Sequence, residues 1–204
     1  MPRKLLGVSL DELEREVDAT IIALDVEEEA AALREATAGW PALVDGLRGE
    51  VRAQRRASLR LAARRARVNR RLDAMCADFA RQLRVVLADD RKHPRWVQFF
   101  KMTPSAFVRQ PLEDQVRAVR GWLSTEEPTL AASREALAAL CTEAEGIFAE
   151  EAAQGHAVAA LRGRRDEVAG ELTKQRDGLH RRLAEVAAER DLERSWADGF
   201  FLRG

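Results

Sequence analysis

The sequence predicts an all-α fold, an elongated antiparallel helical hairpin or coiled-coil bundle built from a tandem duplication of about 100 residues. Three observations favour it. The 204 residues include no Tyr and only 5% aromatic residues, whereas β-rich folds need aromatic and β-branched side chains. Apolar residues recur at steps of three and four over long stretches, which is typical of helices that pack along a seam. The second half of the chain also resembles the first.

This resemblance appears when the chain is aligned with itself at an offset of about 100 residues. Between residues 27 and 100, roughly 23 of about 74 positions are identical, about three times the number expected from composition. Trp96 matches Trp196, and Phe residues follow both. Two helices rich in Ala, Arg and Glu could also resemble each other by composition alone, but composition explains the aromatic match least. We therefore expect two helical repeats, residues 1–100 and 101–204.

Each repeat is predicted to contain a short helix followed by a long one. In the first repeat, Ser9 and Glu12 form a capping-box pattern, so a short acidic helix is expected over residues 9–24. A long basic helix follows, with a break or kink at residues 39–41, because Pro41 lacks a backbone donor and clashes with the preceding turn.

The second repeat has similar signals. Pro104 and Pro111 stand where a first helical turn tolerates proline, and a short helix is expected over residues 111–123. Ser124 and Glu127 form a second capping-box pattern, which predicts the start of the second long helix.

Helix length predicts the topology. A helix from Pro41 to about Lys92 would be about 75 Å long. The connection to the second long helix has about 30 residues and is itself partly helical, so it is too short to run back along that length. The two long helices should therefore be antiparallel, which completes the predicted hairpin.

Polar residues interrupt the predicted seam at the same places in both repeats. Gln54 and Arg65 occupy seam positions in the first repeat, and Gln154 and Arg165 occupy them in the second. Polar seam residues cost stability and commonly fix register or partner number. Alternatively, the apolar stripe drifts around a straight helix and these side chains reach solvent.

Charge alternates along the chain, although the formal net charge is zero. Residues 1–47 carry −7, residues 48–101 carry +11, residues 102–155 carry −5 and residues 156–204 carry +1. The basic block contains the arginine-rich stretch Arg48–Arg71, in which one set of arginines steps by four along a helix face. We call this set the arginine ridge: Arg48, Arg52, Arg56, Arg60 and Arg64. It could neutralise the phosphates of nucleic acid or of an anionic membrane, or it could pair with acidic helices of this chain or of a second protomer.

Aromatic residues gather at two places. Five surround the junction between the repeats, where we expect a packed hydrophobic cluster: Trp96, Phe99, Phe100, Phe107 and Trp122. The second group, close to the C-terminal end of the sequence, is Trp196, Phe200, Phe201 and Leu202. This second group packs against the N-terminal helix of the same chain, or it is a site for another protein.

The sequence lacks the usual motifs of enzymes. It has no phosphate-binding glycine loop, no dinucleotide-binding motif, no nucleophile elbow and no zinc-protease motif. No His lies at ligand spacing from another His or from Cys, and we interpret Cys76 and Cys141 as reduced residues on helices. We therefore expect no catalytic residue, no cofactor, no metal and no small-molecule substrate.

These observations predict a non-enzymatic coiled-coil scaffold or adaptor that acts through self-association or through binding to other proteins. We expect a homo-oligomer. The alternative is a protein that binds nucleic acid or an anionic membrane through the arginine ridge. No apolar run reaches membrane-spanning length and no secretory signal is recognisable, so a cytoplasmic location is expected.

Overall fold

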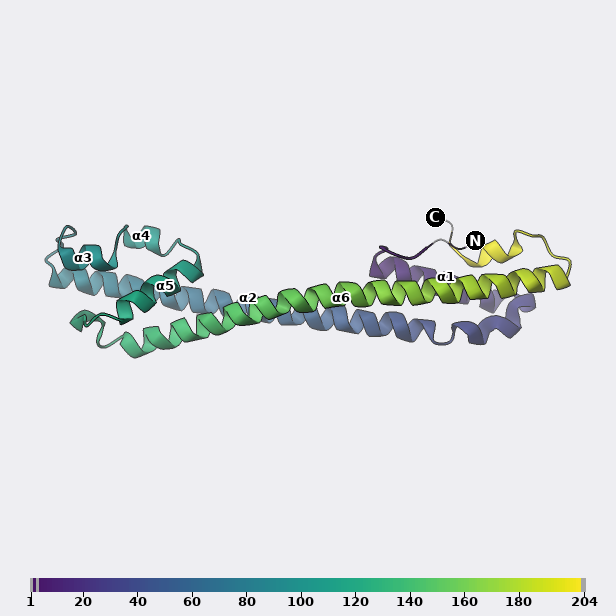
Figure 1. Ribbon diagram of the computed structural model, residues 1–204, viewed down its shortest axis with the longest axis horizontal. Helices are drawn as coiled ribbons and strands as arrows, with labels where there is room; N and C mark the ends of the chain where they lie inside the picture. The colour runs from purple at the N-terminus through teal and green to yellow at the C-terminus, as the bar shows by residue number, and fades with distance from the viewer. Residues whose placement is uncertain (1, 3, 203–204) are drawn as a thin grey trace. The chain divides into compact units, whose positions relative to one another are not determined.

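The computed structural model describes residues 2 and 4–202, and this part of the chain is helical with no strand. Figure 1 shows the elements, which in chain order are α1 (Leu10–Val26), η1 (Glu28–Thr37), α2 (Trp40–Val86), α3 (Pro94–Phe99), α4 (Pro104–Phe107), α5 (Leu112–Leu123), η2 (Pro128–Leu130), α6 (Arg134–Glu189) and η3 (Trp196–Phe200). The chain divides into two compact units, and the long helices α2 and α6 each contribute to both.

Unit 1 consists of the chain up to Arg55 together with the chain from His156 onward. Its core is built from α1, the first part of α2, the last part of α6 and η3. Leu13, Trp40 and Leu172 are among the side chains buried there. Because η3 supplies part of this core, segments from the two ends of the chain fold together in one unit.

Unit 2 is a continuous piece of chain, Arg56–Gly155. Phe79 of α2 lies at the centre of its aromatic cluster, with ring centroids 5.2 Å from Phe99 and 5.4 Å from Trp122. All five aromatic residues predicted to cluster at the junction are buried in this core, which confirms that prediction.

Both predicted short helices are present. Ser9 caps α1: its Oγ accepts a hydrogen bond from the Glu12 amide at 3.2 Å, and the Glu12 carboxylate accepts one from the Ser9 amide at 2.8 Å. This is the predicted capping box. Pro111 is the residue before α5, which starts within one residue of its predicted position.

The first long helix begins at the predicted break. Because α2 starts at Trp40, Pro41 lies in its first turn, where a missing N–H group costs no helical hydrogen bond. The preceding segment is the 3₁₀ helix η1 rather than a helix continuous with α2. Helix α2 ends at Val86, earlier than expected, since Ala88 and Asp89 adopt positive φ angles of 47° and 63° that close the helix.

The predicted capping box at Ser124 is wrong. Ser124 is the residue that ends α5, and its hydroxyl donates to the Gly121 carbonyl at 2.7 Å. Glu127 instead caps η2, where its carboxylate accepts a hydrogen bond from the Thr129 amide at 3.1 Å. The second long helix, α6, begins only at Arg134.

The proline at position 104 signals the start of α4, but the sequence predicts neither the extent of α4 nor the short helix α3. The Thr103 hydroxyl caps α4 by accepting from the Ala106 amide at 3.2 Å, and Pro104 occupies the first helical turn. Helix α3 and helix α4 place Phe99 and Phe107 in the core of unit 2. They therefore build the aromatic cluster that the residue types alone suggested.

Two turns in the chain have nearly the same construction. Glu27 precedes η1 with φ −96° and ψ 111°, and Glu127 precedes η2 with φ −96° and ψ 114°. Arg34 and Arg134 each donate to two backbone carbonyls at the end of the short helix that comes before. These matching residues lie at the offset of the predicted repeats.

A second pair of segments shares an aromatic contact. The rings of Trp96 and Phe100 are 4.9 Å apart between centroids, and those of Trp196 and Phe200 are 4.8 Å apart. In each unit, this pair follows the end of a long helix and packs back on the core.

Candidate functional site

The arginine ridge on α2 is paired at its two ends. In unit 1, Arg48 forms ion pairs with Glu14 and, at 3.2 Å, with Asp11 of α1. In unit 2, Arg64 pairs with Glu150 of α6 at 2.6 Å. Arg48 and Arg64 therefore pair with acidic helices of their own chain, which is one of the alternatives given for the ridge.

The middle of the ridge is different. Arg52, Arg56 and Arg60 are exposed. Their side chains form no ion pair or hydrogen bond with the part of the chain that the structure describes. These three arginines are the part of the ridge that an anionic partner could reach.

Arg65, predicted as a seam residue, connects three helices of unit 2. Its guanidinium donates to Glu113 of α5 at 2.8 Å and to Glu151 of α6 at 2.7 Å. It also lies over the Phe148 ring, 5.4 Å from the centroid. The hydrogen bond from Arg65 holds the pKa of Glu113 below its ordinary value, and the same bond raises the pKa of Arg65. Arg65 thus joins α2 to both α5 and α6.

The other predicted seam residues make fewer contacts. Gln54 and Gln154 are half-buried, and the buried Nε2 of Gln54 has no hydrogen-bond partner among the described residues. Arg165 pairs with its neighbour Asp166 at 3.2 Å. A role for these residues in setting register stays a prediction.

The predicted protein-interaction group near the C-terminal end packs largely within unit 1. Phe200 and Phe201 are buried, and Trp196 is half-buried against the same core. Leu202 is 40% exposed. Phe200 and Phe201 therefore pack against their own chain, which is one of the two alternatives given for this group.

Sequence reasoning missed a buried ion pair in unit 1. Arg176 of α6 donates to the Glu16 carboxylate of α1 at 2.6 Å, and both side chains are fully buried. The guanidinium also lies over the Phe201 ring, 5.1 Å from its centroid. Glu16 stands on the apolar face of α1 beside Leu13 and Val17, a signal that it needs a buried partner.

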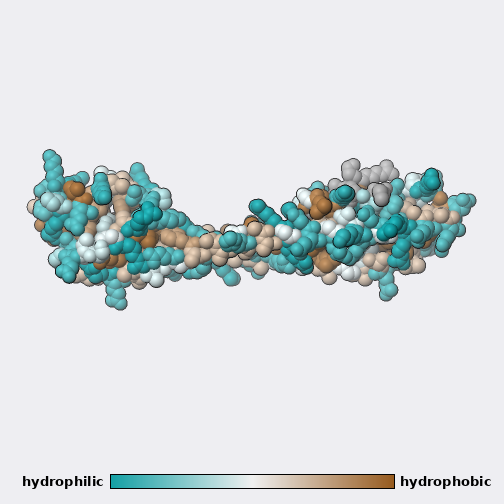
Figure 2. All heavy atoms as spheres, viewed as in Figure 1, coloured by the Kyte–Doolittle hydropathy of each residue, from teal (hydrophilic) through white to brown (hydrophobic). Residues whose placement is uncertain are grey.

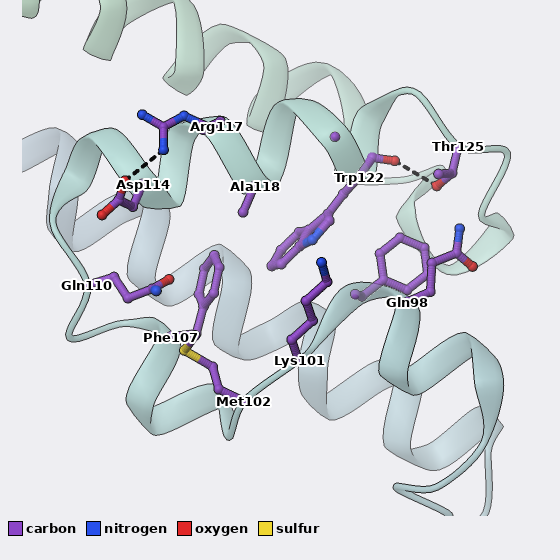
Figure 3. Close-up of a pocket in the computed structure, with 12 residues that line it drawn as sticks. Gln98, Lys101, Met102, Phe107, Gln110, Asp114, Arg117, Ala118, Trp122 and Thr125 are labelled. Carbon is purple, nitrogen blue, oxygen red and sulfur yellow. Dashed lines mark hydrogen bonds and ion pairs between the residues drawn. The ribbon is translucent and has the colours of Figure 1, made fainter.

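Sequence reasoning also missed a groove of about 540 Å³ in unit 2. In Figure 3, the rings of Phe107 and Trp122 and the side chain of Lys101 gather around it. Helix α5 forms one wall, where Ala118 and Gly121 have little or no side chain. The groove therefore combines aromatic surface with space beside α5.

Charged groups lie at the rim of this groove. Arg117 and Asp114, one turn apart on α5, form an ion pair at 2.9 Å (Figure 3). Lys101 is exposed and makes no ion pair within the described part of the chain. The rim thus offers one uncompensated positive charge next to apolar surface.

Apolar side chains are exposed on the outer side of α1 in unit 1. The face of each unit visible in Figure 2 is mostly hydrophilic, with hydrophobic patches between the charged side chains. On α1, Ile22 is 61% and Val26 72% exposed. They share one side of the helix with the exposed residues Arg15 and Asp18, at helical spacing. We call these four residues the α1 outer face.

The two cysteines are unsuited to nucleophilic chemistry. Cys76 and Cys141 are free and buried in the core of unit 2. Burial raises the pKa of the Cys141 thiol to about 11, and it raises the pKa of Cys76 as well. Both thiols are therefore protonated at neutral pH.

No group of three or more His, Cys, Asp or Glu residues that could hold a metal ion is found in residues 2 and 4–202. Within the same residues, no helix has the length and apolar character needed to cross a membrane.

Comparisons with family models, curated proteins and solved structures found no match to this chain.

Proposed function

We propose that this protein is a non-enzymatic scaffold or adaptor that works by self-association and by binding other proteins. The observation that carries the proposal is the α1 outer face, where Ile22 and Val26 are exposed although every Phe and Trp residue except Phe148 and Trp196 is buried. Exposed apolar side chains grouped on one helix face are typical of protein interaction sites. The free, buried cysteines support a cytoplasmic location, where thiols stay reduced.

We further propose that the chain arose by tandem duplication and that α2 and α6 act as the two arms of an antiparallel helical hairpin. The paired geometry of Glu27 with Glu127 and of Arg34 with Arg134 supports the duplication. Unit 1 draws on both predicted repeats, so neither repeat alone contains all the segments of that unit. Such mutual dependence is expected when two copies of an associating helical element are fused.

Light scattering over a concentration series at low and high salt tests the proposed function. A defined species larger than the 22.8 kDa monomer, with a population that rises with concentration, is the expected result. Because the proposed contact combines apolar surface with charge, high salt should weaken it but not abolish it. A monomer at all concentrations would contradict self-association.

A second candidate function is binding of nucleic acid or an anionic membrane surface. The exposed side chains of Arg52, Arg56 and Arg60 favour it. Substituting all three by Gln should weaken binding to DNA or to anionic vesicles and reduce the salt slope by about one unit per arginine.

The matched control makes the same charge change in unit 1, at Arg182 of α6 and at Arg190 and Arg194 in the segment that follows α6, all of which are exposed as well. Equal losses in the two triple variants would mean that only net charge matters. If the wild-type protein shows no salt-dependent binding, this second function is excluded.

A further inference from the structure

We propose that the α1 outer face of one copy docks into the unit 2 groove of a second copy, beside α5. This inference rests on the self-association proposed above and names its two surfaces. The occupant of the groove is thus a helix of this same protein, and the argument comes from a comparison of α1 with α5.

Burial aligns these two short helices at an offset of 99 residues. Leu13 and Val17 of α1 are buried like Leu112 and Val116 of α5, and a buried polar residue stands between them in both helices. The carbonyl of Leu24 accepts from Arg34 just as that of Leu123 accepts from Arg134. The inner faces of α1 and α5 therefore correspond residue by residue.

The outer faces then correspond too, but their shapes are opposite. At the position where α5 has Gly121, which lines the groove, α1 has the exposed Ile22. Val26 corresponds to Thr125, another groove residue. The corresponding helix faces therefore differ in shape: apolar side chains protrude from α1, whereas α5 borders a groove.

Their charges are opposite as well. Arg15 and Asp18 of α1 correspond to Asp114 and Arg117 of α5. The groove rim also carries the unpaired Lys101, and the block of sequence that contains α1 has a net charge of −7. In the proposed contact, the protruding apolar side chains of α1 enter the aromatic groove beside α5. The positive and negative side chains of α1 then face side chains of opposite charge on α5, and such complementarity in shape and charge specifies a protein contact.

The two surfaces belong to different units, so the contact is head-to-tail rather than self-complementary. Each copy keeps one free α1 outer face and one free groove after it has bound a neighbour, and such heterologous contacts extend into rings or open chains. This distinguishes the proposed interface from a symmetric dimer.

Two variants test the contact from its two sides. Ile22→Glu places a charge on the exposed face of α1, and Gly121→Leu fills the groove. Apart from its chain neighbours and the nearby backbone of α5, a Cβ at Gly121 would meet no heavy atom of the described residues within 4 Å, so the second substitution fits the fold. Each variant alone should weaken self-association at least about tenfold. An equimolar mixture should recover association but stop at a dimer, because each variant retains the surface that the other lacks.

Val85→Glu is the matched control, since Val85 is 79% exposed on α2 outside both surfaces, and it should associate like the wild type. Circular dichroism checks that all variants remain helical. If the wild type associates and both variants associate equally well, the proposed contact is wrong while self-association stands. Loss of association in both variants without recovery in the mixture would also overturn the head-to-tail contact. A monomeric wild type would overturn this inference and the self-association together.

Discussion

The two units bury different chemistry at positions that the proposed duplication would make equivalent. In unit 1, Arg176 is buried in an ion pair with Glu16. In unit 2, the position 100 residues earlier is Cys76, buried in an apolar core beside Phe79. Each unit combines parts of α2 and α6 with a short helix, and unit 1 buries a charge pair while unit 2 buries an aromatic cluster. The two cores differ in the free energy of burial, because the attraction within a buried ion pair must offset the free energy needed to remove two charges from water.

Breaking the ion pair of unit 1 should have the largest effect. Arg176→Met removes the guanidinium that pairs with the buried Glu16 carboxylate, and we expect a loss of about 3 to 5 kcal/mol in the free energy of unfolding. Urea unfolding followed by circular dichroism measures it.

The double variant Glu16→Leu/Arg176→Met is the control. It removes both charges and makes unit 1 resemble the apolar core of unit 2, so it should be far more stable than the single variant. If the double variant is as unstable as Arg176→Met, the loss of stability comes from removing the ion pair and not from leaving the Glu16 carboxylate buried without Arg176.

Exchanging one side chain between the units should have an intermediate effect. Phe79→Leu gives unit 2 the residue that unit 1 has at Leu179, and it removes ring contacts with Phe99, Phe100 and Trp122. We expect a loss of about 1 to 2 kcal/mol. An unchanged free energy of unfolding would show that the aromatic centre of unit 2 is interchangeable with the aliphatic core of unit 1.

Acid should produce the smallest effect, and it should act on unit 2. The hydrogen bond from Arg65 lowers the pKa of Glu113, and the one from Arg120 lowers the pKa of Glu145, from an ordinary value of 4.5. A carboxyl whose pKa is lowered by folding stabilises the protein at any pH above the pKa that it has in the unfolded chain. This stability is lost as the pH falls through the pKa that the carboxyl has in the folded chain. The urea midpoint should therefore fall as pH drops below about 4.5.

Glu113→Gln provides the comparison for this pH dependence. The variant should be less stable than the wild type at neutral pH and should lose less stability on acidification. A pH profile identical to that of the wild type would contradict the role of the Arg65–Glu113 bond.

Local signals in the sequence were sufficient for much of the fold. The capping box at Ser9 and the proline at position 41 predict helix starts because they act through neighbouring backbone groups. The same kind of signal failed at Ser124, where α5 ends and Glu127 caps η2 instead. Between Ser124 and the start of α6, the Arg134 guanidinium donates to the Thr125 carbonyl, a contact between residues nine positions apart that the capping pattern does not include.

The candidate sites were harder to predict because they depend on distant residues. Glu16 and Arg176 are 160 positions apart, and no spacing rule connects them. The groove exists because α3, α4 and α5 pack together, and short helices such as α3 and α4 have no apolar period to reveal them. The aromatic group near the C-terminal end had a composition typical of an interaction site, yet Phe200 and Phe201 are buried by α1 and α6 of their own unit.

Cross-linking between copies tests whether α1 of one copy lies in the unit 2 groove of another. An equimolar mixture of isotope-labelled and unlabelled protein is treated with a carbodiimide that joins lysine to carboxylate, and mass spectrometry identifies peptides that contain both isotopes. The lysines in the sequence are Lys4, Lys92, Lys101 and Lys174. The account predicts that mixed-isotope products join Lys101, at the groove, to Asp18 of the α1 outer face. Products that join copies only through Lys4 or Lys174 of unit 1 would contradict it.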